Sequence, residues 1–365
     1  MVSGPASSLG DRLSVVLLTY NCAHRIEPVV ERLLGLGVPV IAVDNGSGDG
    51  TAEVLERHES LEVVRLPRNI GAAGRNAGAD RADTPYLLFC DDDGWYEPAG
   101  LAEVCDLFDE HPRLGVVNAR ILVNDEERLD PICVEMADSP LPDRHGLPGA
   151  VLLSFMAGAV VIRADAYRSV GGYDERFFLG GEEETLAHKL AKAGWQLRYL
   201  PSIVMHHHPS LANAGRLRAY GMRNTVVNAW LHRPWRSALR WTLFTLADTP
   251  KNQDFVRGLA LTAGAVPWIV RERDPMVAAL DSDLLALDRR RFAARRPVLT
   301  RRSWRPEDSR PSPAPRASGV AATEPGVDSG GGHLTAGIGG GKGTAGGALE
   351  EKRSIVRGGS APWNG

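Results

Sequence analysis

Short apolar segments alternate with segments of helical character along the first third of the chain. Such an alternation of strands and helices is typical of a parallel, doubly wound sheet, so we expect an α/β fold with a mostly parallel central sheet. Helices are expected where apolar residues recur at helical spacing, as from Ile26 to Leu34 and from Leu101 to Phe108. The predicted strands are residues 13–18, 38–43, 61–66 and 86–90.

Three adjacent acids, Asp91, Asp92 and Asp93, directly follow the fourth predicted strand. Carboxylates so close together repel one another unless a cation or a basic ligand neutralises them, and hard oxygen ligands suit Mg²⁺ or Mn²⁺. Open α/β sheets bind their ligands at the carboxyl ends of the strands, which is where these acids stand. A charge run is often only a solvated turn, so the acids alone leave both interpretations open.

Further acids and a run of histidines follow in the second half of the α/β part. The segment Glu182-Glu183-Glu184 opens a predicted helix, where the helix dipole favours acids whether or not they are functional. The segment His206-His207-His208 follows the last predicted strand. The expected elements here are a strand at 114–123, a long loop rich in proline and charge at 125–149, a return to the sheet at 157–162 and a strand at 197–205.

The alternation stops after residue 210, and four helices are expected at 217–231, 238–247, 255–265 and 276–292. Tryptophans lie among arginines in this region, which suits either a packed core or a membrane interface. Fifteen glycines occur from Gly319 onward, so that tail cannot bury enough apolar surface to become ordered. We therefore divide the chain into a disordered N-terminus (1–12), an α/β domain (13–210), a helical C-terminal region (211–305) and a disordered tail (306–365).

The sequence totals exclude several classes of protein. The net charge is −3, so no general affinity for nucleic acid is expected. The four cysteines show no CxxC spacing, which favours free thiols in a reducing compartment. No apolar signal segment precedes Arg12, and the longest nearly apolar runs, 150–162 and 258–270, are shorter than the ~20 residues that span a bilayer. We expect a cytoplasmic protein, at most peripheral at the inner face of the plasma membrane through residues 230–305.

Two glycine-rich segments do not fit the common nucleotide-binding motifs. The segment from Gly46 to Gly50 follows the second strand, and it lacks the GxGxxG spacing of dinucleotide-binding proteins. The segment from Gly71 to Gly78 is not a P-loop, because no GK[ST] follows it. An aspartyl phosphatase would carry its DxD motif after the first strand and a lysine downstream, and neither is found.

Taken together, the motifs resemble those of family 2 glycosyltransferases of the bacterial rhamnosyltransferase-like type. The resemblance covers residues 13–210, with the motifs in the family's order and spacing. It implies the GT-A fold, a nucleotide-sugar-binding α/β domain, in agreement with the alternation described above. The matching segments are Thr19-Tyr20-Asn21, Val43-Asp44-Asn45-Gly46-Ser47-Gly48-Asp49-Gly50-Thr51, Asn69-Ile70-Gly71 with Gly74-Arg75-Asn76-Ala77-Gly78, Asp91-Asp92-Asp93, Gly171-Gly172-Tyr173-Asp174-Glu175-Arg176-Phe177-Phe178, Gly181-Glu182-Glu183 and the histidines.

The resemblance assigns roles in binding a nucleotide-diphospho-sugar donor. Thr19, Tyr20, Asn21 and Asp44 correspond to nucleotide-binding positions. A carboxylate that accepts the ring N–H of a pyrimidine would make Asp44 favour UDP- or dTDP-sugars. Arg75 corresponds to the basic contact beside the nucleotide.

The resemblance also implies a divalent metal, Mg²⁺ or Mn²⁺. Asp91 and Asp93 stand at the two ends of the family's DXD motif, which reaches the ribose and the cation that bridges the diphosphate. Asp91 and Asp92 are assigned to the nucleotide-sugar, and Asp93 and His207 to the metal. The register among the three adjacent histidines stays open, because His is a common ligand and each could close the site.

Glu183 aligns with the family's catalytic base, which takes the proton of the acceptor hydroxyl in an inverting transfer. We expect the positive end of the helix dipole to keep this carboxylate ionised. The chain departs from the family pattern at two positions. The family often has Asp at the position of Glu183 and an acid at the position of Thr185. The second departure leaves the register among Glu182, Glu183 and Glu184 open.

These residues imply a metal-dependent, inverting glycosyltransferase of hexosyltransferase type that acts in cell-envelope or surface glycan synthesis. The acceptor would be a glycan, a lipid-linked molecule or a small molecule. The alternative is a degenerate, non-catalytic relative that binds sugars or a partner enzyme. Intact acids at all three chemical positions argue against that alternative.

Overall fold

The computed structural model describes residues 8–209 and 218–295. The predicted disordered tail, 306–365, lies outside the described residues, and so do residues 1–7 of the predicted disordered N-terminus. The rest of that N-terminal prediction is wrong, because Leu9–Arg12 form a short helix, α1. Ser8 donates two hydrogen bonds to Asp11 at the start of α1, and Arg12 forms an ion pair with Asp106 at 2.7 Å.

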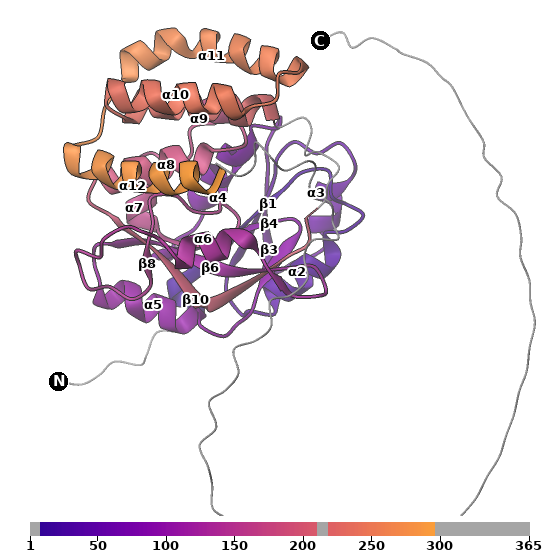
Figure 1. Ribbon diagram of the computed structural model, residues 1–365. Helices are drawn as coiled ribbons and strands as arrows, with labels where there is room; N and C mark the ends of the chain where they lie inside the picture. Colours follow the sequence, from indigo (N-terminus) through magenta and orange to yellow (C-terminus); the bar gives the residue numbers. More distant parts are fainter. Residues whose placement is uncertain (1–7, 210–217, 296–365) are drawn as a thin grey trace, which may run out of the picture. The chain divides into compact units, whose positions relative to one another are not determined.

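One sheet of ten strands organises the described α/β part (Figure 1). The strands are β1 (Leu13–Thr19), β2 (Val40–Asp44), β3 (Leu61–Arg65), β4 (Tyr86–Asp91), β5 (Gly94–Tyr96), β6 (Leu114–Val123), β7 (Arg128–Leu129), β8 (Ala150–Val151), β9 (Val160–Arg163) and β10 (Gln196–His207). Their order is β3-β2-β1-β4-β9-β6-β10-β5, with β7 beside β6 and β8 beside β10. The central strands read as continuous apolar runs because both of their faces are covered, as in β4, whose residues 86–90 are all buried.

The predicted mostly parallel α/β sheet is confirmed. β1, β2, β3 and β4 are mutually parallel neighbours, and β6 and β10 run in the same direction. The return to the sheet that was predicted at 157–162 differs from strict parallel alternation, because this strand, β9, pairs antiparallel with both β4 and β6. An antiparallel return needs no crossover helix, and the segment between β6 and β9 instead includes the short strands β7 and β8, which pair with β6 and β10.

The helices of the α/β part pack on the sheet and lead into or out of its strands. Gly78, on the fourth of them, lies so close to β1 that a Cβ there would be 2.5 Å from Val16 Cγ1. This close approach places Arg75, one turn earlier, in the protein interior. The elements are α2 (Glu27–Leu34), α3 (Thr51–Leu55), η1 (Gly71–Ala73), α4 (Gly74–Ala79), α5 (Leu101–Glu110), α6 (Pro131–Ala137), α7 (Ala164–Ser169), η2 (Glu175–Phe177) and α8 (Glu182–Lys192).

Part of the predicted loop at 125–149 is wrong, because it contains β7 and the helix α6. Asp130 caps α6 by accepting a hydrogen bond from the Ile132 N–H at 2.9 Å, and Pro131 occupies the first helical position. Both features are ordinary helix-start signals. They are hidden in the sequence by the surrounding proline and charge, while Cys133 and Met136 supply the buried face.

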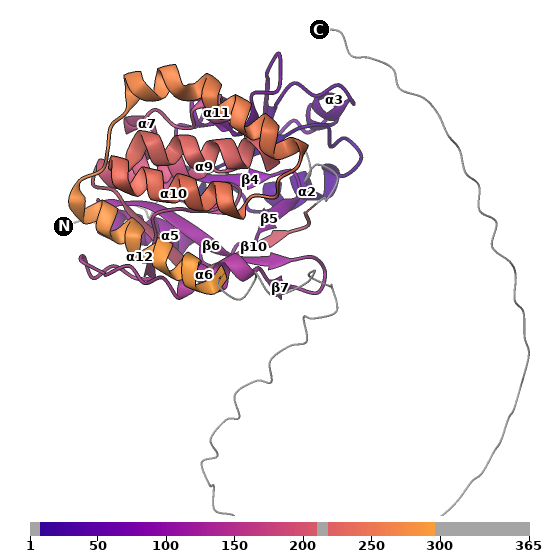
Figure 2. The ribbon, with the colours of Figure 1, turned by 45° about the horizontal axis from the view of Figure 1, so that its top comes forward.

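The four predicted C-terminal helices are present. α9 packs against α8, α10 and α11, and α12 runs back toward α6 (Figures 1 and 2). α11 continues seven residues beyond its predicted end through Pro267, where Trp268 and Ile269 pack against the α9 side. None of the described helices is long and apolar enough to cross a bilayer. The helices are α9 (Arg218–His232), α10 (Trp235–Asp248), α11 (Gln253–Glu272) and α12 (Ala278–Arg295).

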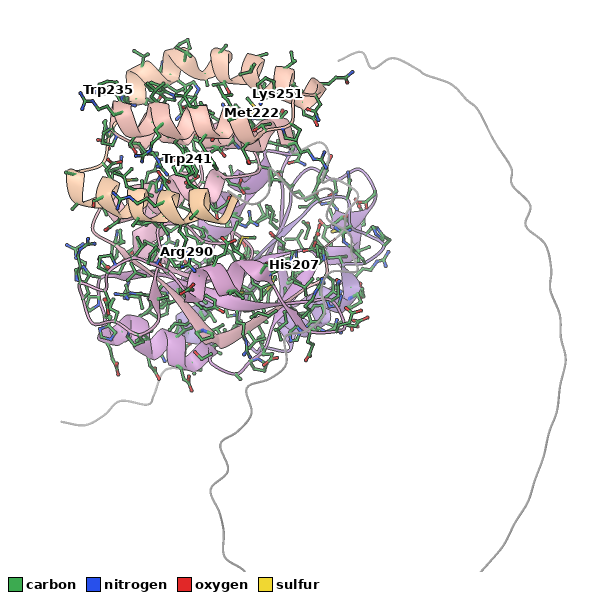
Figure 3. All side chains as sticks on the ribbon, in the orientation of Figure 1. His207, Met222, Trp235, Trp241, Lys251 and Arg290 are labelled. Carbon is green, nitrogen blue, oxygen red and sulfur yellow. The ribbon has the colours of Figure 1, made fainter. Side chains whose placement is uncertain are left out.

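Most of the tryptophans of this region contribute to packing. Trp241 is buried and stacks against Phe244, and Trp230 and Trp268 pack against buried clusters. Trp235, at the start of α10, is the exception because 59% of it is exposed (Figure 3). The packing interpretation therefore holds for three of the four tryptophans that the sequence pointed to.

Candidate active site

Three strands deliver site residues to one edge of the sheet. β1 ends at Thr19, β2 at Asp44 and β4 at Asp91. Strand pairing places Thr19 beside Asp44 and Leu18 beside Asp91. The carboxyl ends of these parallel strands therefore bring together residues that lie far apart in the sequence, as the position of the acids predicted.

The loop after β1 is held in place by the loop after β2. The Asn21 N–H donates to Ser47 Oγ, and the Asn21 side chain accepts from the Gly48 N–H, both at 2.9 Å. Asp44 accepts one hydrogen bond, from the Ser47 N–H at 3.2 Å. Its second carboxylate oxygen is buried and has no partner among the described residues. An unpaired buried acceptor at this edge has the chemistry needed to receive an N–H from a ligand.

The first two acids after β4 have different partners. Asp91 pairs with Arg75, whose side chain is almost fully buried. Gly158 leaves room for this pair, since a Cβ there would lie 2.4 Å from an Asp91 oxygen. Asp92 points the other way, toward the loop after β1. It accepts from the Tyr20 N–H at 3.2 Å and from Arg25 at 2.7 Å.

The third acid faces one of the three histidines. β5 pairs antiparallel with the end of β10, which puts His207 opposite Gly94 and its Nε2 3.6 Å from Asp93 Oδ1. His206 instead contacts Glu97 at 3.0 Å, and His208 stacks on the Trp95 ring. Of the three, His207 is the one whose imidazole meets the acid cluster.

The electrostatics of Asp93 suit a cation. Burial, reinforced by Asp91, raises the pKa of Asp93 to about 6, although His207 acts in the opposite direction. The described residues contain no group of three or more His, Cys, Asp and Glu side chains poised to hold a metal. Two octahedral ligands at right angles lie about 3 Å apart, so Asp93 and His207 fit as neighbouring ligands of one ion that takes its others from outside the protein.

The three acids that open α8 lie in three different surroundings. Glu182 is buried beside the Arg75 guanidinium, and one of its oxygens has no described hydrogen-bond partner. Glu183 lines a cavity of about 420 Å³ that is also bounded by residues 132–156. Glu184 lines a separate cavity of about 400 Å³ between the C-terminal helices. Arg75 therefore links Asp91 to the pair formed by Glu182 and Glu183.

The helix dipole does not lower the pKa of Glu183, contrary to the expectation. Burial and the adjacent Glu182 raise the pKa of Glu183 well above its ordinary range. Burial also raises the pKa of Glu182, against the lowering influence of Arg75. In this site desolvation outweighs the dipole, whose effect on a charge is typically below 1 kcal/mol.

Hydrogen bonds from a residue of α9 hold the turn that leads into α8. Asn224 is fully buried, and its Nδ2 lies 2.8 Å from the Phe177 carbonyl oxygen, 3.2 Å from that of Leu179 and 2.9 Å from that of Gly180. Within this turn Phe178 has a φ of 61°, which is strained for a bulky side chain. The hydrogen bonds from Asn224 hold a backbone path that the turn would not adopt unaided.

Comparison with known proteins decides the family. A family model described as glycosyl transferase family 2 matches residues 14–168, which include the three strand ends and the acid cluster. Residues 14–168 form a glycosyl transferase family 2 domain. Its match to the family supports the assignment of this chain as a glycosyltransferase enzyme, and the sheet with its helical C-terminal region confirms the expected GT-A fold.

Characterised relatives agree with this assignment. The glycosyltransferase is 26% identical over 276 residues to the N-acetylglucosaminyl-diphospho-decaprenol L-rhamnosyltransferase of Mycobacterium tuberculosis, covering 64% of this chain and 89% of the relative. It is 32% identical over 209 residues to the pre-mycofactocin glycosyltransferase of the same organism, covering 54% of this chain and 43% of that protein. The structure of S. aureus TarS 1-349 in complex with UDP-GlcNAc shares the fold, with a TM-score of 0.50 and 15% identity, over 72% of this chain and 82% of that one.

Several residues of the glycosyltransferase site had no signal in the sequence. Arg25 lies just before a helix-forming segment, and its contact with Asp92 spans 67 positions. Gly158 stands in a run of small residues without a motif, although it sets the room for Asp91. Asn224 lies in the helical region, outside the segment that resembles the family. The one available sequence signal for Asn224 was the presence of an asparagine in the middle of an apolar helix face.

We expect Asn224→Ala to lower kcat while leaving the KM for the donor nearly unchanged. The variant removes an amide whose two N–H groups are shared among three carbonyl oxygens of the turn before Glu182 and Glu183, and the loss of such buried partners typically costs about 1–3 kcal/mol of stability. Steady-state kinetics well below the melting temperature separate positioning from unfolding. Thr225→Ala is the matched control, because among the described residues the Thr225 hydroxyl donates to the Gly221 carbonyl of its own helix and does not reach the turn. An equal fall in kcat in both variants would contradict the positioning role of Asn224.

Proposed function

We propose that this glycosyltransferase moves a sugar, with inversion, from a nucleotide-diphospho-sugar to an acceptor hydroxyl in cell-envelope glycan synthesis. Residues 13–210 form the GT-A domain in this proposal, and 211–305 form a helical region that supports it, ahead of the tail at 306–365. The observation that carries the proposal is the position of Arg75, which forms an ion pair with Asp91 on the donor side and whose charge favours the ionised form of Glu182, the neighbour of Glu183.

The donor is proposed to lie along the carboxyl ends of β1, β2 and β4. The unpaired oxygen of Asp44 accepts the ring N–H of uracil or thymine, with Thr19, Tyr20 and Asn21 around the base. Asp91, fixed by Arg75, and Asp92 bind the nucleotide-sugar beside it. Asp93 and His207 hold Mg²⁺ or Mn²⁺, which would neutralise the charge that develops on the departing diphosphate.

Glu183 is proposed to act as the general base. It removes the proton from the acceptor hydroxyl while the hydroxyl oxygen forms a bond to the anomeric carbon. The bond between that carbon and the phosphate oxygen breaks, and the nucleoside diphosphate leaves with the electron pair. Because burial raises the pKa of Glu183, its ionised carboxylate is a stronger base than an ordinary glutamate.

A screen of nucleotide-sugars by thermal shift tests the donor proposal. A ligand that binds the native state raises the apparent Tm, so UDP- or dTDP-sugars are expected to stabilise the protein with Mn²⁺ present. The shift should disappear with EDTA, and slow donor hydrolysis should accompany binding. Donor binding without any hydrolysis would favour the alternative of a non-catalytic sugar-binding module. No response to any nucleotide-sugar would contradict the proposal.

We also propose that the exposed face of α11 rests on the inner face of the plasma membrane. Its exposed surface from residue 258 to 270 carries no charge, and the basic residues Arg257 and Arg271 flank it, the latter in an ion pair with Glu272 at 2.9 Å. Such an apolar helix face with basic edges suits an anionic lipid surface. The exposed large apolar residues of α11 are Val256, Leu259, Val266 and Val270, with exposed fractions of 65%, 40%, 49% and 74%.

Flotation with vesicles of phosphatidylglycerol and phosphatidylcholine tests the membrane proposal. The protein is expected to float with these vesicles, and Val266→Asp combined with Val270→Asp should abolish flotation by placing charge on the apolar face. Val134→Asp is a control, because Val134 is 56% exposed on α6, away from α11. Equal recovery in the soluble fraction with and without vesicles would reject membrane contact.

A further inference from the structure

The cavity beside Glu183 has a lining that differs from the donor side of the site. Its volume of about 420 Å³ is in the range of small-molecule sites. Most of its lining is apolar and comes from three parts of the chain: α6, the strand-free segment before β9, and α12. Representative lining residues are Ile132, Met136, Leu152, Phe155, Met156 and Leu287.

This lining restricts what can enter beside the base. A carbohydrate chain would bring several hydroxyl groups into the cavity, and each buried hydroxyl without a partner costs about 1–3 kcal/mol. Apart from Glu183, the polar side chains that line the cavity are Glu135, Ser139 and Ser154 and two arginines of α12. The part of an acceptor that enters is therefore mainly apolar, with its reacting hydroxyl at Glu183.

The two arginines of α12 give the cavity a positive side. Arg290 forms an ion pair with Asp138, and it lies between α12 and α6 in Figure 3. Arg291 also lines the cavity, and no ion pair joins it to any described carboxylate. Its guanidinium carbon lies 5.8 Å from the centre of the Trp241 ring, a contact that uses the guanidinium face and not its N–H donors, and Arg291 stands between this cavity and the one that Glu184 lines.

We propose that this cavity is the acceptor site and that the acceptor is an anionic amphiphile. Its apolar body fills the cavity, its hydroxyl meets Glu183, and its phosphate or carboxylate binds Arg291. The inference rests on the proposed function, because it takes Glu183 as the base. Two sources share this chemistry: a lipid-linked phosphate and a small free acid.

Calorimetric titration of the purified protein with paired probes tests the inference. Farnesyl phosphate and farnesol represent the lipid source, and 4-hydroxyphenylacetate and 4-hydroxyphenylacetamide represent the free acid. At least one anionic probe is expected to bind about ten-fold more tightly than its neutral partner, and more tightly than inorganic phosphate. The pair that shows the difference identifies the source. Equal affinity within both pairs, or no binding of either anion, would overturn the inference.

Variants separate a specific site from general attraction between charges. Arg291→Glu should remove the preference for the anionic probe. Arg289→Glu should keep it, because Arg289 is exposed on the same helix and does not line the cavity. Met136→Trp should weaken the binding of both probes of a pair, because the larger side chain fills the cavity. If Met136→Trp does not fold, Arg291→Glu decides the outcome. Equal loss in Arg289→Glu and Arg291→Glu would overturn the inference.

The proposed function can fail separately from this inference. Hydrolysis of a nucleotide-sugar by the wild-type protein with Mn²⁺ and without any acceptor reports on the donor site alone. Absence of hydrolysis together with tight binding of an anionic probe would contradict the catalytic proposal and leave the amphiphile site standing. Hydrolysis without probe binding would do the reverse.

Discussion

Replacing Glu183 with Gln is expected to lower kcat by roughly 10²–10⁴, which is the usual contribution of general base catalysis. Glutamine fills the same space beside the acceptor cavity but cannot take a proton from the attacking hydroxyl. Donor binding should remain nearly intact, because the contacts proposed for the donor lie at the ends of β1, β2 and β4. Single-turnover kinetics and donor titration measure the two effects separately. Normal turnover in this variant would discard the base assignment.

The pH dependence of kcat offers a second check on the same residue. Burial and Glu182 raise the pKa of Glu183 above 4.5, so the wild-type rate should rise with pH through an acid limb displaced above that value. The direction follows because the base works only after it has lost its proton. Glu184→Gln is the matched control. Glu184 lies on the same helical turn but lines the other cavity, so the variant should keep most of the activity.

Replacing Asp93 with Ala is expected to abolish measurable transfer and to weaken Mn²⁺-dependent donor binding. Asp93 and His207 are the proposed protein ligands of the metal, and loss of one ligand removes charge stabilisation worth several kcal/mol. A loss of that size is roughly a 10²-fold change in rate or more. Kinetics and donor titration over a range of Mn²⁺ concentrations measure it.

Asp125→Ala controls for a general loss of negative charge near the histidines. The Asp125 side chain is 98% exposed and lies 3.9 Å from His208, so its removal should change neither donor binding nor rate. Full activity of Asp93→Ala at ordinary Mn²⁺ concentrations would remove Asp93 from the proposed metal site. Equal effects of both substitutions would reduce its role to long-range electrostatics.

The fold was largely predictable because apolar periodicity determines which segments can be strands and helices. The runs at 86–90 and 114–123 carry no competing signal, and β4 and β6 follow them almost residue for residue. α6 was missed because a charged, proline-rich segment hides its cap and its short apolar face. The reversal of β9 was missed because strand direction depends on the connection in space, which periodicity does not encode.

The candidate site was predictable where it follows strand ends and was missed where it depends on tertiary contact. Asp44, Asp91 and Thr19 converge because neighbouring parallel strands end at the same edge. The direction of the pKa shift of Glu183 was predicted wrongly, because its burial, the largest cause of the shift, is invisible in a linear sequence. The role of Asn224 comes from a helix that packs across the turn more than 40 positions away.

The antiparallel strand β9 has a consequence for how the specificity of this enzyme can change. Between β6 and β9, which pair directly with each other, the chain makes a long excursion that adds only the short strands β7 and β8 to the sheet, so strand pairing fixes both ends of the excursion. That excursion supplies α6 and most of the wall around the acceptor cavity, whereas the donor residues stand on other strands. Mutations can therefore accumulate around α6 without displacing Asp44 or Asp91, whereas Gly158, near the end of the excursion, must stay small beside Asp91. Evolution can exchange the molecule that receives the sugar and keep the molecule that gives it.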